Sequence, residues 1–327
     1  MGPLENVQLG STGVKVTRLG LGGAPMGALS LDVGIDIANE TLKKAYEEGV
    51  RYFDTAPLYG SGKSEVFFGE FLSTLDRDSF TLSSKVGRVL DGPYTPSGDS
   101  TNVNTSELKV SFDYSRDGVL RSIEESLVRL NLDRIDVALI HDPDDHYEEA
   151  LDTTFPTLAD LRSQGVIGAI GSGMNQWEML ADFARNADFD CFLIAGRYTL
   201  LDYSALTEFF PICEEKSISV ILGGPYNSGI LASDLGPEST YFYETAPQNV
   251  IEKAKSIRDI CNDFNIPLKA AALQFGLLHP VVAATIPGAR KPAEIAENVK
   301  MASINIPSDL WRNLKSTGLL PEQAPTD

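Results

Sequence analysis

The chain has 327 residues, of which 43% are hydrophobic and 22% charged, a composition typical of a globular protein with a large core. Asp and Glu number 46 against 27 Lys and Arg, and the formal charge of −19 would repel phosphate backbones, which argues against nucleic acid as a partner. The first ten residues carry no signal pattern, no uncharged apolar run is long enough to cross a bilayer, and three scattered cysteines fit a reducing compartment, so we expect a cytoplasmic protein with no membrane partner.

Short apolar runs alternate with longer amphipathic stretches along the whole chain, which is the pattern of successive strand–helix units around a parallel sheet. A small hairpin at the start, formed by Gln8–Gly13 and Val14–Val16, is expected to plug the barrel floor. Eight barrel strands are then predicted, at Val16–Gly22, Tyr52–Thr55, Thr81–Lys85, Ile135–His141, Val166–Gly171, Cys191–Ala195, Ser219–Leu222 and Val282–Ile286. Apolar residues at helical spacing predict helices at Ile37–Glu48, Arg116–Leu130, Met179–Ala187, Asn249–Phe264 and from Pro292 onward.

The sequence contains no low-complexity linker and no repeat beyond this rhythm, so it predicts one α/β domain over residues 1–327, a (β/α)8 TIM barrel. Two long loops, Gly87–Tyr114 and Gly223–Pro247, suit lids or pocket walls at the C-terminal face of the barrel. Two glycine-containing segments imitate nucleotide-binding motifs. Gly20–Pro25 has proline at the third glycine position of the dinucleotide fingerprint, and Gly62-Lys63-Ser64 lacks the leading glycine of a P-loop and is better explained as a helix start.

Three predicted strands end in an ionisable residue at the same end: Asp54, Lys85 and His141. In a barrel the C-terminal strand ends form one face, where active sites lie. Tyr59 follows Asp54 by five residues, across a turn short enough to return its phenol over the barrel mouth. Any one of these residues alone is more readily explained as the first polar residue of a loop, but together they indicate a site.

The four side chains suit proton transfer in alcohol and carbonyl chemistry. A tyrosine has a pKa of about 10, so it is a poor base near neutrality unless a positive charge stabilises the phenolate. Lys85 can supply that charge, Asp54 can keep the lysine protonated, and His141 can hydrogen-bond the substrate oxygen. No metal is required, and we expect the acidic cluster Asp142, Asp144, Asp145 and His146 to be a solvated loop.

The run from Asp54 to Tyr59, the strand ending at Lys85 and the strand ending at His141 closely resemble the aldo-keto reductase superfamily over nearly the whole chain. The resemblance implies a (β/α)8 barrel, a catalytic tetrad of Asp54, Tyr59, Lys85 and His141, and an extended NAD or NADP across the strand ends. The segments 112–119, 171–177 and 195–202 are similar to the aldose 1-dehydrogenase branch, which includes L-fucose (D-threo-aldose) dehydrogenase and pyridoxal 4-dehydrogenase. Its members oxidise the anomeric carbon of sugars such as L-fucose, D-arabinose or L-galactose, or the cyclic hemiacetal of pyridoxal, to a lactone with NAD+.

The segment Ile286–Asn298 matches the adenosine-binding loop and helix of the family, in which Glu297 and Asn298 would contact adenine. Many NADPH-dependent members have arginine where this chain has Glu294, and a carboxylate there would repel a 2′-phosphate, so NAD is favoured. Arg290 keeps NADP open because it can reach a 2′-phosphate. The full predicted cofactor set is Gly23, Ala24, Asp54, Ser172, Gly173, Gly223, Gly224, Pro225, Asn227, Gly229, Pro287, Gly288, Arg290, Glu294, Glu297 and Asn298.

The chain departs from the common family pattern at three positions, where Asn, Gln and a stacking Tyr are replaced by Gly173, Ala195 and Gly223. Three alternatives stay open: an NADPH-dependent aldehyde or ketone reductase, a cofactor-sensing subunit without activity, and a metal-dependent hydrolase using Asp54, His141, His279 and a modified Lys85. The aromatic residues of the second long loop suit sugar stacking and loop packing equally well: Tyr226, Tyr241, Phe242 and Tyr243.

Overall fold

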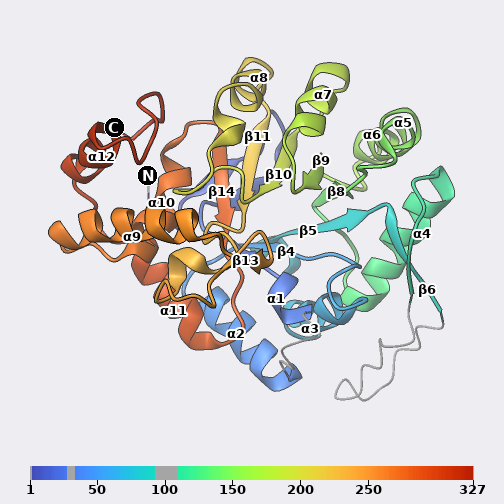
Figure 1. The fold of residues 1–327 in the computed structure, drawn as a ribbon. Helices are drawn as coiled ribbons and strands as arrows, with labels where there is room; N and C mark the ends of the chain where they lie inside the picture. Colours follow the sequence, from blue (N-terminus) through green and yellow to red (C-terminus); the bar gives the residue numbers. More distant parts are fainter. Residues whose placement is uncertain (1, 28–33, 93–108, 327) are drawn as a thin grey trace.

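The computed structural model describes residues 2–27, 34–92 and 109–326. Within them, eight parallel strands pair in chain order around a barrel (Figure 1): β3 (Leu21–Gly22), β4 (Tyr52–Asp54), β5 (Thr81–Val86), β8 (Val137–His141), β9 (Ala169–Met174), β10 (Cys191–Ala195), β11 (Ser219–Gly223) and β14 (Val282–Ile286). Two parallel bridges, Leu19 to Thr285 and Gly22 to Gly288, join the first strand to the last. The prediction of a (β/α)8 barrel is therefore confirmed.

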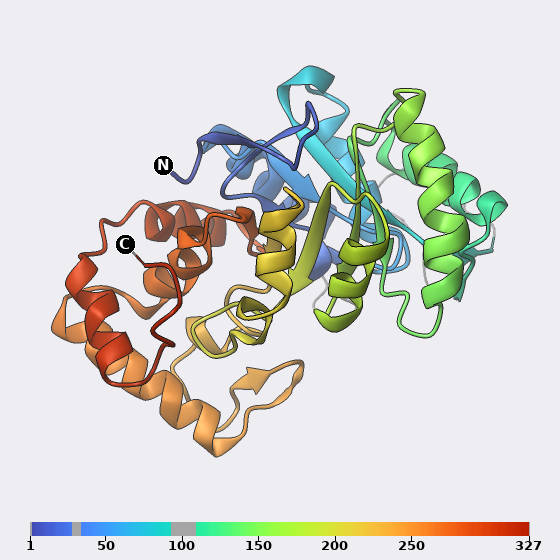
Figure 2. The same cartoon turned by 90° about the horizontal axis from the view of Figure 1, so that it is seen from above.

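Helices surround the strands, as the view from above shows (Figure 2). The longer ones are α2 (Ile35–Glu47), α3 (Lys63–Leu72), α4 (Arg116–Leu130), α6 (Phe155–Ser163), α7 (Glu178–Asn186), α8 (Phe209–Glu215), α9 (Gln248–Asp263), α10 (Leu268–Phe275), α11 (Pro292–Ala302) and α12 (Ser308–Ser316). The predicted bounds of α4 hold because Ser115 accepts a hydrogen bond from the Gly118 backbone N–H and Asn131 ends the helix at a φ of 49°. Since α3 begins at Lys63, the P-loop-like segment is a helix start, as predicted.

Two strand predictions were wrong at their starts by three residues or more, and a third, Ile135–His141, began two residues early because β8 starts at Val137. The stretch predicted as Val16–Gly22 is divided: β2 (Lys15–Thr17) pairs antiparallel with β1 (Asn6–Gln8), and the barrel strand begins at Leu21. The stretch predicted as Val166–Gly171 begins at Ala169, because Gly165 turns at a φ of 73° and Val166 is exposed.

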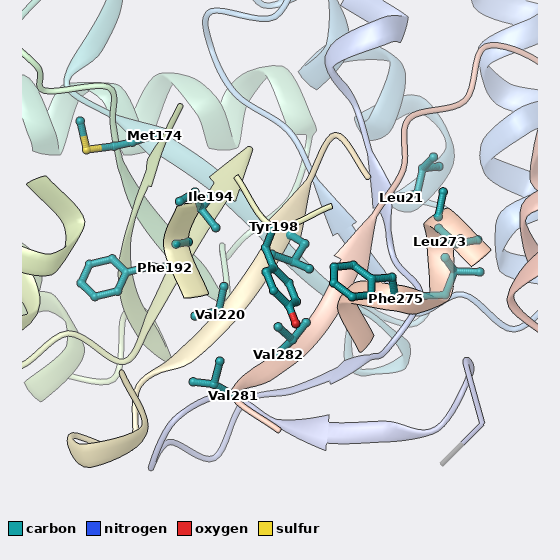
Figure 3. Packing of buried hydrophobic residues seen from close by; sticks show 14 of the residues in the cluster. Leu21, Met174, Phe192, Ile194, Tyr198, Val220, Leu273, Phe275, Val281 and Val282 are labelled. Carbon is teal, nitrogen blue, oxygen red and sulfur yellow. The ribbon is translucent and has the colours of Figure 1, made fainter. Parts of the chain in front are cut away.

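Two apolar cores lie on opposite sides of the strands. The inner core fills the barrel and includes Leu9 and Val16 of the hairpin, and the Gly10 N–H donates to the Ser219 hydroxyl at the start of β11 (2.8 Å). The hairpin therefore plugs the barrel floor, as predicted, but its strands are Asn6–Gln8 and Lys15–Thr17 and not Gln8–Gly13 and Val14–Val16. The outer core lies between strands and helices; Figure 3 shows part of it, where Tyr198 stacks on Phe275 with ring centroids 4.8 Å apart.

Both long loops contain short antiparallel pairs. After Gly87 the chain forms β6 (Arg88–Asp91) and β7 (Lys109–Phe112), while residues 93–108 of the predicted loop lie outside the described residues. The loop after β11 contains a 3-10 turn at Ile230–Ala232 and the pair β12 (Thr240–Tyr241) and β13 (Glu244–Thr245). Across the described part of the chain, no helix combines the length and apolar character needed to cross a bilayer.

Candidate active site

Strand alternation brings the predicted ionisable residues to one mouth of the barrel. Successive side chains of a strand point to opposite faces, and Tyr52 and Leu139 belong to the inner core. Two residues further on, Asp54 and His141 therefore also point inward, at the C-terminal ends of β4 and β8. Lys85, next to last in β5, joins them, and the structure thus assembles the predicted group in one place.

Lys85 and Asp54 form a buried ion pair, with side chains 1% and 2% exposed. The Lys85 Nζ donates to both carboxylate oxygens at 3.0 and 2.8 Å and to the Thr55 carbonyl at 3.0 Å, while the Ser83 hydroxyl donates to Asp54 Oδ1 at 2.7 Å. Burial lowers the pKa of Lys85, but the charges and hydrogen bonds of Asp54 and Tyr59 together outweigh it, so the net shift of that pKa is upward. The ammonium is therefore a fixed positive charge near neutral pH.

Tyr59 and His141 lie against this charge. The Lys85 Nζ is 4.6 Å from the centroid of the Tyr59 ring, and the Tyr59 and His141 rings meet edge to face at 5.8 Å. Burial raises the pKa of Tyr59, and the Lys85 charge opposes that increase without cancelling it. Burial also holds the pKa of His141 well below its usual value, so this imidazole is neutral at pH 7.

Three small residues lie near the C-terminal ends of neighbouring strands: Gly173 in β9, Ala195 in β10 and Gly223 in β11. A Cβ added at Gly173 would lie 3.5 Å from Lys85 Cε, and one at Gly223 would lie 3.3 Å from Leu193 Cδ2 and 3.5 Å from the Ala195 Cβ. The three positions that depart from the family pattern therefore carry little side-chain volume close to Lys85.

The segment predicted to bind adenosine forms the start of α11. Glu294 accepts a hydrogen bond from the Arg290 backbone N–H at 2.8 Å and pairs with the Arg290 guanidinium at 3.3 Å. Glu297 pairs with Lys269 at 2.8 Å. The Tyr226 hydroxyl donates to Asn298 Oδ1 at 2.8 Å, so the loop after β11 is tied to this helix.

Some predicted cofactor residues have their polar groups occupied by neighbouring parts of the chain. The Ser172 hydroxyl donates to the Ile140 carbonyl at 2.9 Å, the Asn227 amide donates to the Gly196 carbonyl at 3.1 Å, and the Gly23 N–H donates to the Asp54 carbonyl at 2.7 Å. Pro225 and Pro287 are buried, and Gly288 is partly buried. Other members of the predicted set are exposed: Ala24, Gly224, Gly229 and Arg290.

The expectation of a solvated acidic loop was wrong for Asp142. Its side chain is only 14% exposed, Arg88 contacts its Oδ2 at 3.1 Å, and the same oxygen lies 3.6 Å from His141 Nε2. Asp144 and Asp145 are exposed, as expected. The sequence signal for Asp142 was its position directly after His141, since that residue begins the loop at the barrel mouth.

Tyr114 supports this corner of the site. Its hydroxyl donates to the His141 carbonyl at 2.8 Å and to the Asp142 carbonyl at 3.1 Å. The ring crosses directly over Gly87, where an added Cβ would meet it at 2.1 Å and where φ is 95°. Glycine is therefore required at position 87 for both reasons.

One of the four residues of the alternative hydrolase site, His279, lies apart from the others. His279 precedes β14 and so lies at the opposite end of the barrel from His141, packed edge-on against Tyr198 and Phe210. In the ranges that the structure describes, no group of three or more His, Cys, Asp or Glu residues is arranged to hold a metal ion.

Comparison with known proteins agrees with this geometry. The model of the aldo/keto reductase family matches residues 18–318. The chain is 38% identical to a pyridoxal 4-dehydrogenase from Microbacterium luteolum, over 97% of this chain and 98% of that protein, and 38% identical to a D-threo-aldose 1-dehydrogenase from a Pseudomonas species, over 95% and 97%. An aldo-keto reductase structure from Bacillus halodurans superposes with a TM-score of 0.76 at 24% identity, covering 98% and 99% of the two chains. The chain therefore belongs to the aldo/keto reductase family and is an NAD(P)-dependent oxidoreductase acting on a small molecule.

Proposed function

We propose that the protein oxidises the anomeric carbon of an aldose of the L-fucose, D-arabinose or L-galactose type, or the cyclic hemiacetal of pyridoxal, to a lactone with NAD+. The observation that carries the chemistry is the buried Lys85–Asp54 pair beside the Tyr59 ring, with His141 edge-on to the phenol. The names of the two relatives at 38% identity support the substrate class.

A nicotinamide cofactor fits the residues present. The small residues Gly173, Ala195 and Gly223 at the strand ends would lie beside the nicotinamide ring, and the start of α11 would hold the adenosine end. When bound, this cofactor would accept the hydride from the substrate carbon. The Glu294–Arg290 pair favours an unphosphorylated ribose, because the guanidinium already has a carboxylate partner.

Side chains of the protein would transfer the proton. Tyr59 would take the proton from the anomeric hydroxyl, with the Lys85 charge stabilising the phenolate that must form first. Asp54 would hold Lys85 in place. Neutral His141 would hydrogen-bond the substrate oxygen and orient it toward Tyr59, since the two rings are in contact.

NADH formation by the purified protein tests the proposal, with NAD+ or NADP+ offered against L-fucose, D-arabinose, L-galactose, D-glucose and pyridoxal. Turnover with NAD+ and one of the first three sugars or pyridoxal is the expected result. No turnover with any of them, together with NADPH consumption on simple aldehydes, would make the protein a reductase and refute the proposal.

Replacing Glu294 with arginine is expected to raise the NADP+/NAD+ ratio of kcat/KM by at least about tenfold, because a cation replaces the carboxylate that would face a 2′-phosphate. Steady-state kinetics with both cofactors measure the ratio. Glu294→Gln is the matched control: it removes the repulsion without adding a cation, so its ratio should lie between those of the other two proteins. An unchanged ratio in Glu294→Arg contradicts the assignment of Glu294.

A further inference from the structure

We propose that Asp142 determines substrate specificity, its carboxylate accepting hydrogen bonds from hydroxyl groups on the substrate carbons next to the reacting one. This inference rests on the proposed function and deepens it, since it favours a polyhydroxy aldose over pyridoxal.

The Asp142 carboxylate lies close to the place where the reacting oxygen would bind. Asp142 Oδ2 lies 3.6 Å from His141 Nε2, and this imidazole edge is assigned to the reacting oxygen. A group hydrogen-bonded to Nε2 therefore has its neighbouring atoms within reach of Asp142. Within the described residues, Asp142 Oδ1 accepts no hydrogen bond, so one oxygen of a largely buried carboxylate is left for a ligand.

The backbone fixes this position. The Asp142 N–H donates to the Gly173 carbonyl at 3.0 Å, and the residue has a φ of 41°, a conformation that aspartate and asparagine tolerate better than most residues. Arg88 holds the other side of the carboxylate at 3.1 Å, and Tyr114 holds the carbonyl. The carboxylate is thus held in place before any ligand arrives, which suits recognition.

Exposed aromatic rings are available near this corner of the site. Phe112 is 53% exposed and lies under the Arg88 guanidinium, 5.0 Å from its ring centroid, and Arg88 is the cation that pairs with Asp142. Tyr243, from the loop after β11, is 79% exposed. Rings for the apolar face of a sugar, and one carboxylate for its hydroxyls, match the usual composition of a small-molecule site.

Hydroxyl donors distinguish the two candidate substrates. The ring form of an aldose carries hydroxyls on two successive carbons beyond the anomeric one, and both can donate to one carboxylate. The hemiacetal of pyridoxal has an aromatic ring in place of those carbons and a single phenolic hydroxyl there. Each hydrogen-bond donor stabilises a largely buried carboxylate, so Asp142 favours the aldose, which offers two hydroxyls, over pyridoxal, which offers one.

The test is Asp142→Asn, which keeps the side-chain size and tolerates the positive φ but removes the charge. We expect kcat/KM for the preferred aldose to fall roughly 10- to 100-fold, mainly through KM, and to fall several-fold more than kcat/KM for reduction of a simple aliphatic aldehyde with NADH. Asp145→Asn, an exposed aspartate of the same loop, is the control and should leave both rates unchanged.

A comparison on the wild-type protein needs no variant. It should oxidise the preferred aldose roughly 10-fold or more better than the 2-deoxy analogue, and Asp142→Asn should reduce this difference. Equal kcat/KM values for the two sugars, or equal losses of Asp142→Asn on sugar and simple aldehyde, would overturn the assignment while leaving the proposed function intact. Oxidation of pyridoxal without oxidation of any aldose would refute this inference alone, whereas absence of turnover with both would refute the proposed function as well.

Discussion

Replacing Tyr59 with phenylalanine is expected to lower kcat/KM by about 10²- to 10⁴-fold and to leave NADH affinity within about twofold of the wild type. The substitution removes only the hydroxyl, and the ring keeps its contacts with Lys85 and His141. Steady-state assays and fluorescence titration with NADH measure the two quantities. Tyr46→Phe is the matched control, since Tyr46 lies on α2 beside Phe71, away from the barrel mouth. Full activity in Tyr59→Phe would remove this residue from the proposed tetrad.

The pH dependence of the oxidation rate is a second test of the role of Tyr59. Because burial raises the pKa of Tyr59 above its usual value, the phenol is protonated at pH 7 to 9, and the phenolate fraction grows about tenfold with each pH unit in that range. Oxidation needs the phenolate, so its rate should rise with pH, whereas aldehyde reduction uses the protonated phenol and should not. The residual activity of Tyr59→Phe should lack the rise.

The barrel was predictable from sequence because its signals are local. Apolar runs separated by amphipathic stretches gave all eight strands, and α4 was placed correctly by the Ser115 cap and its apolar spacing. The two larger errors came from places where tertiary contacts outweigh the apolar pattern. Val16 is as apolar as a barrel residue, but it pairs with Val7 beneath the barrel, and Val166 is an exposed apolar residue in a turn.

The meeting of Asp54, Lys85 and His141 was predictable for a related reason: parallel strands in a barrel place their C-terminal ends on one face. Asp142 was missed because its burial depends on Arg88, which approaches from a hairpin 54 residues earlier in the chain. The position of Asp142 directly after His141 places it at the barrel mouth, but the local sequence does not show that Asp142 is buried and Asp144 exposed, so only the tertiary structure separates the two.

A second buried ion pair, between α3 and α4, was also invisible in the sequence. Arg129 Nε contacts Glu65 Oε2 at 2.6 Å, and the side chains are 1% and 0% exposed. The Ser84 hydroxyl donates to the other Glu65 oxygen at 2.8 Å, so the pair is attached to β5 directly before Lys85. Ser84 points away from the barrel interior, which separates this network from the catalytic face.

Arg129→Met is therefore expected to lower the free energy of unfolding by about 3–5 kcal/mol, because it leaves the Glu65 carboxylate buried without its cation. The folded fraction should keep activity close to that of the wild type, since Lys85 faces the other side of β5. Urea denaturation measures the stability. Arg116→Met, on the same helix, removes the exposed pair with Asp160 and should cost at most about 1 kcal/mol.

Adding Glu65→Gln to Arg129→Met should recover much of the lost stability, because the amide keeps an oxygen for the Ser84 hydroxyl while the unpaired charge is gone. A double variant no more stable than Arg129→Met would mean that lost packing of the long arginine side chain, and not the buried charge, causes the destabilisation. If Arg129→Met is no less stable than Arg116→Met, the Arg129–Glu65 pair makes no net contribution to the free energy of unfolding. Apolar contacts alone would then hold α3 and α4 together.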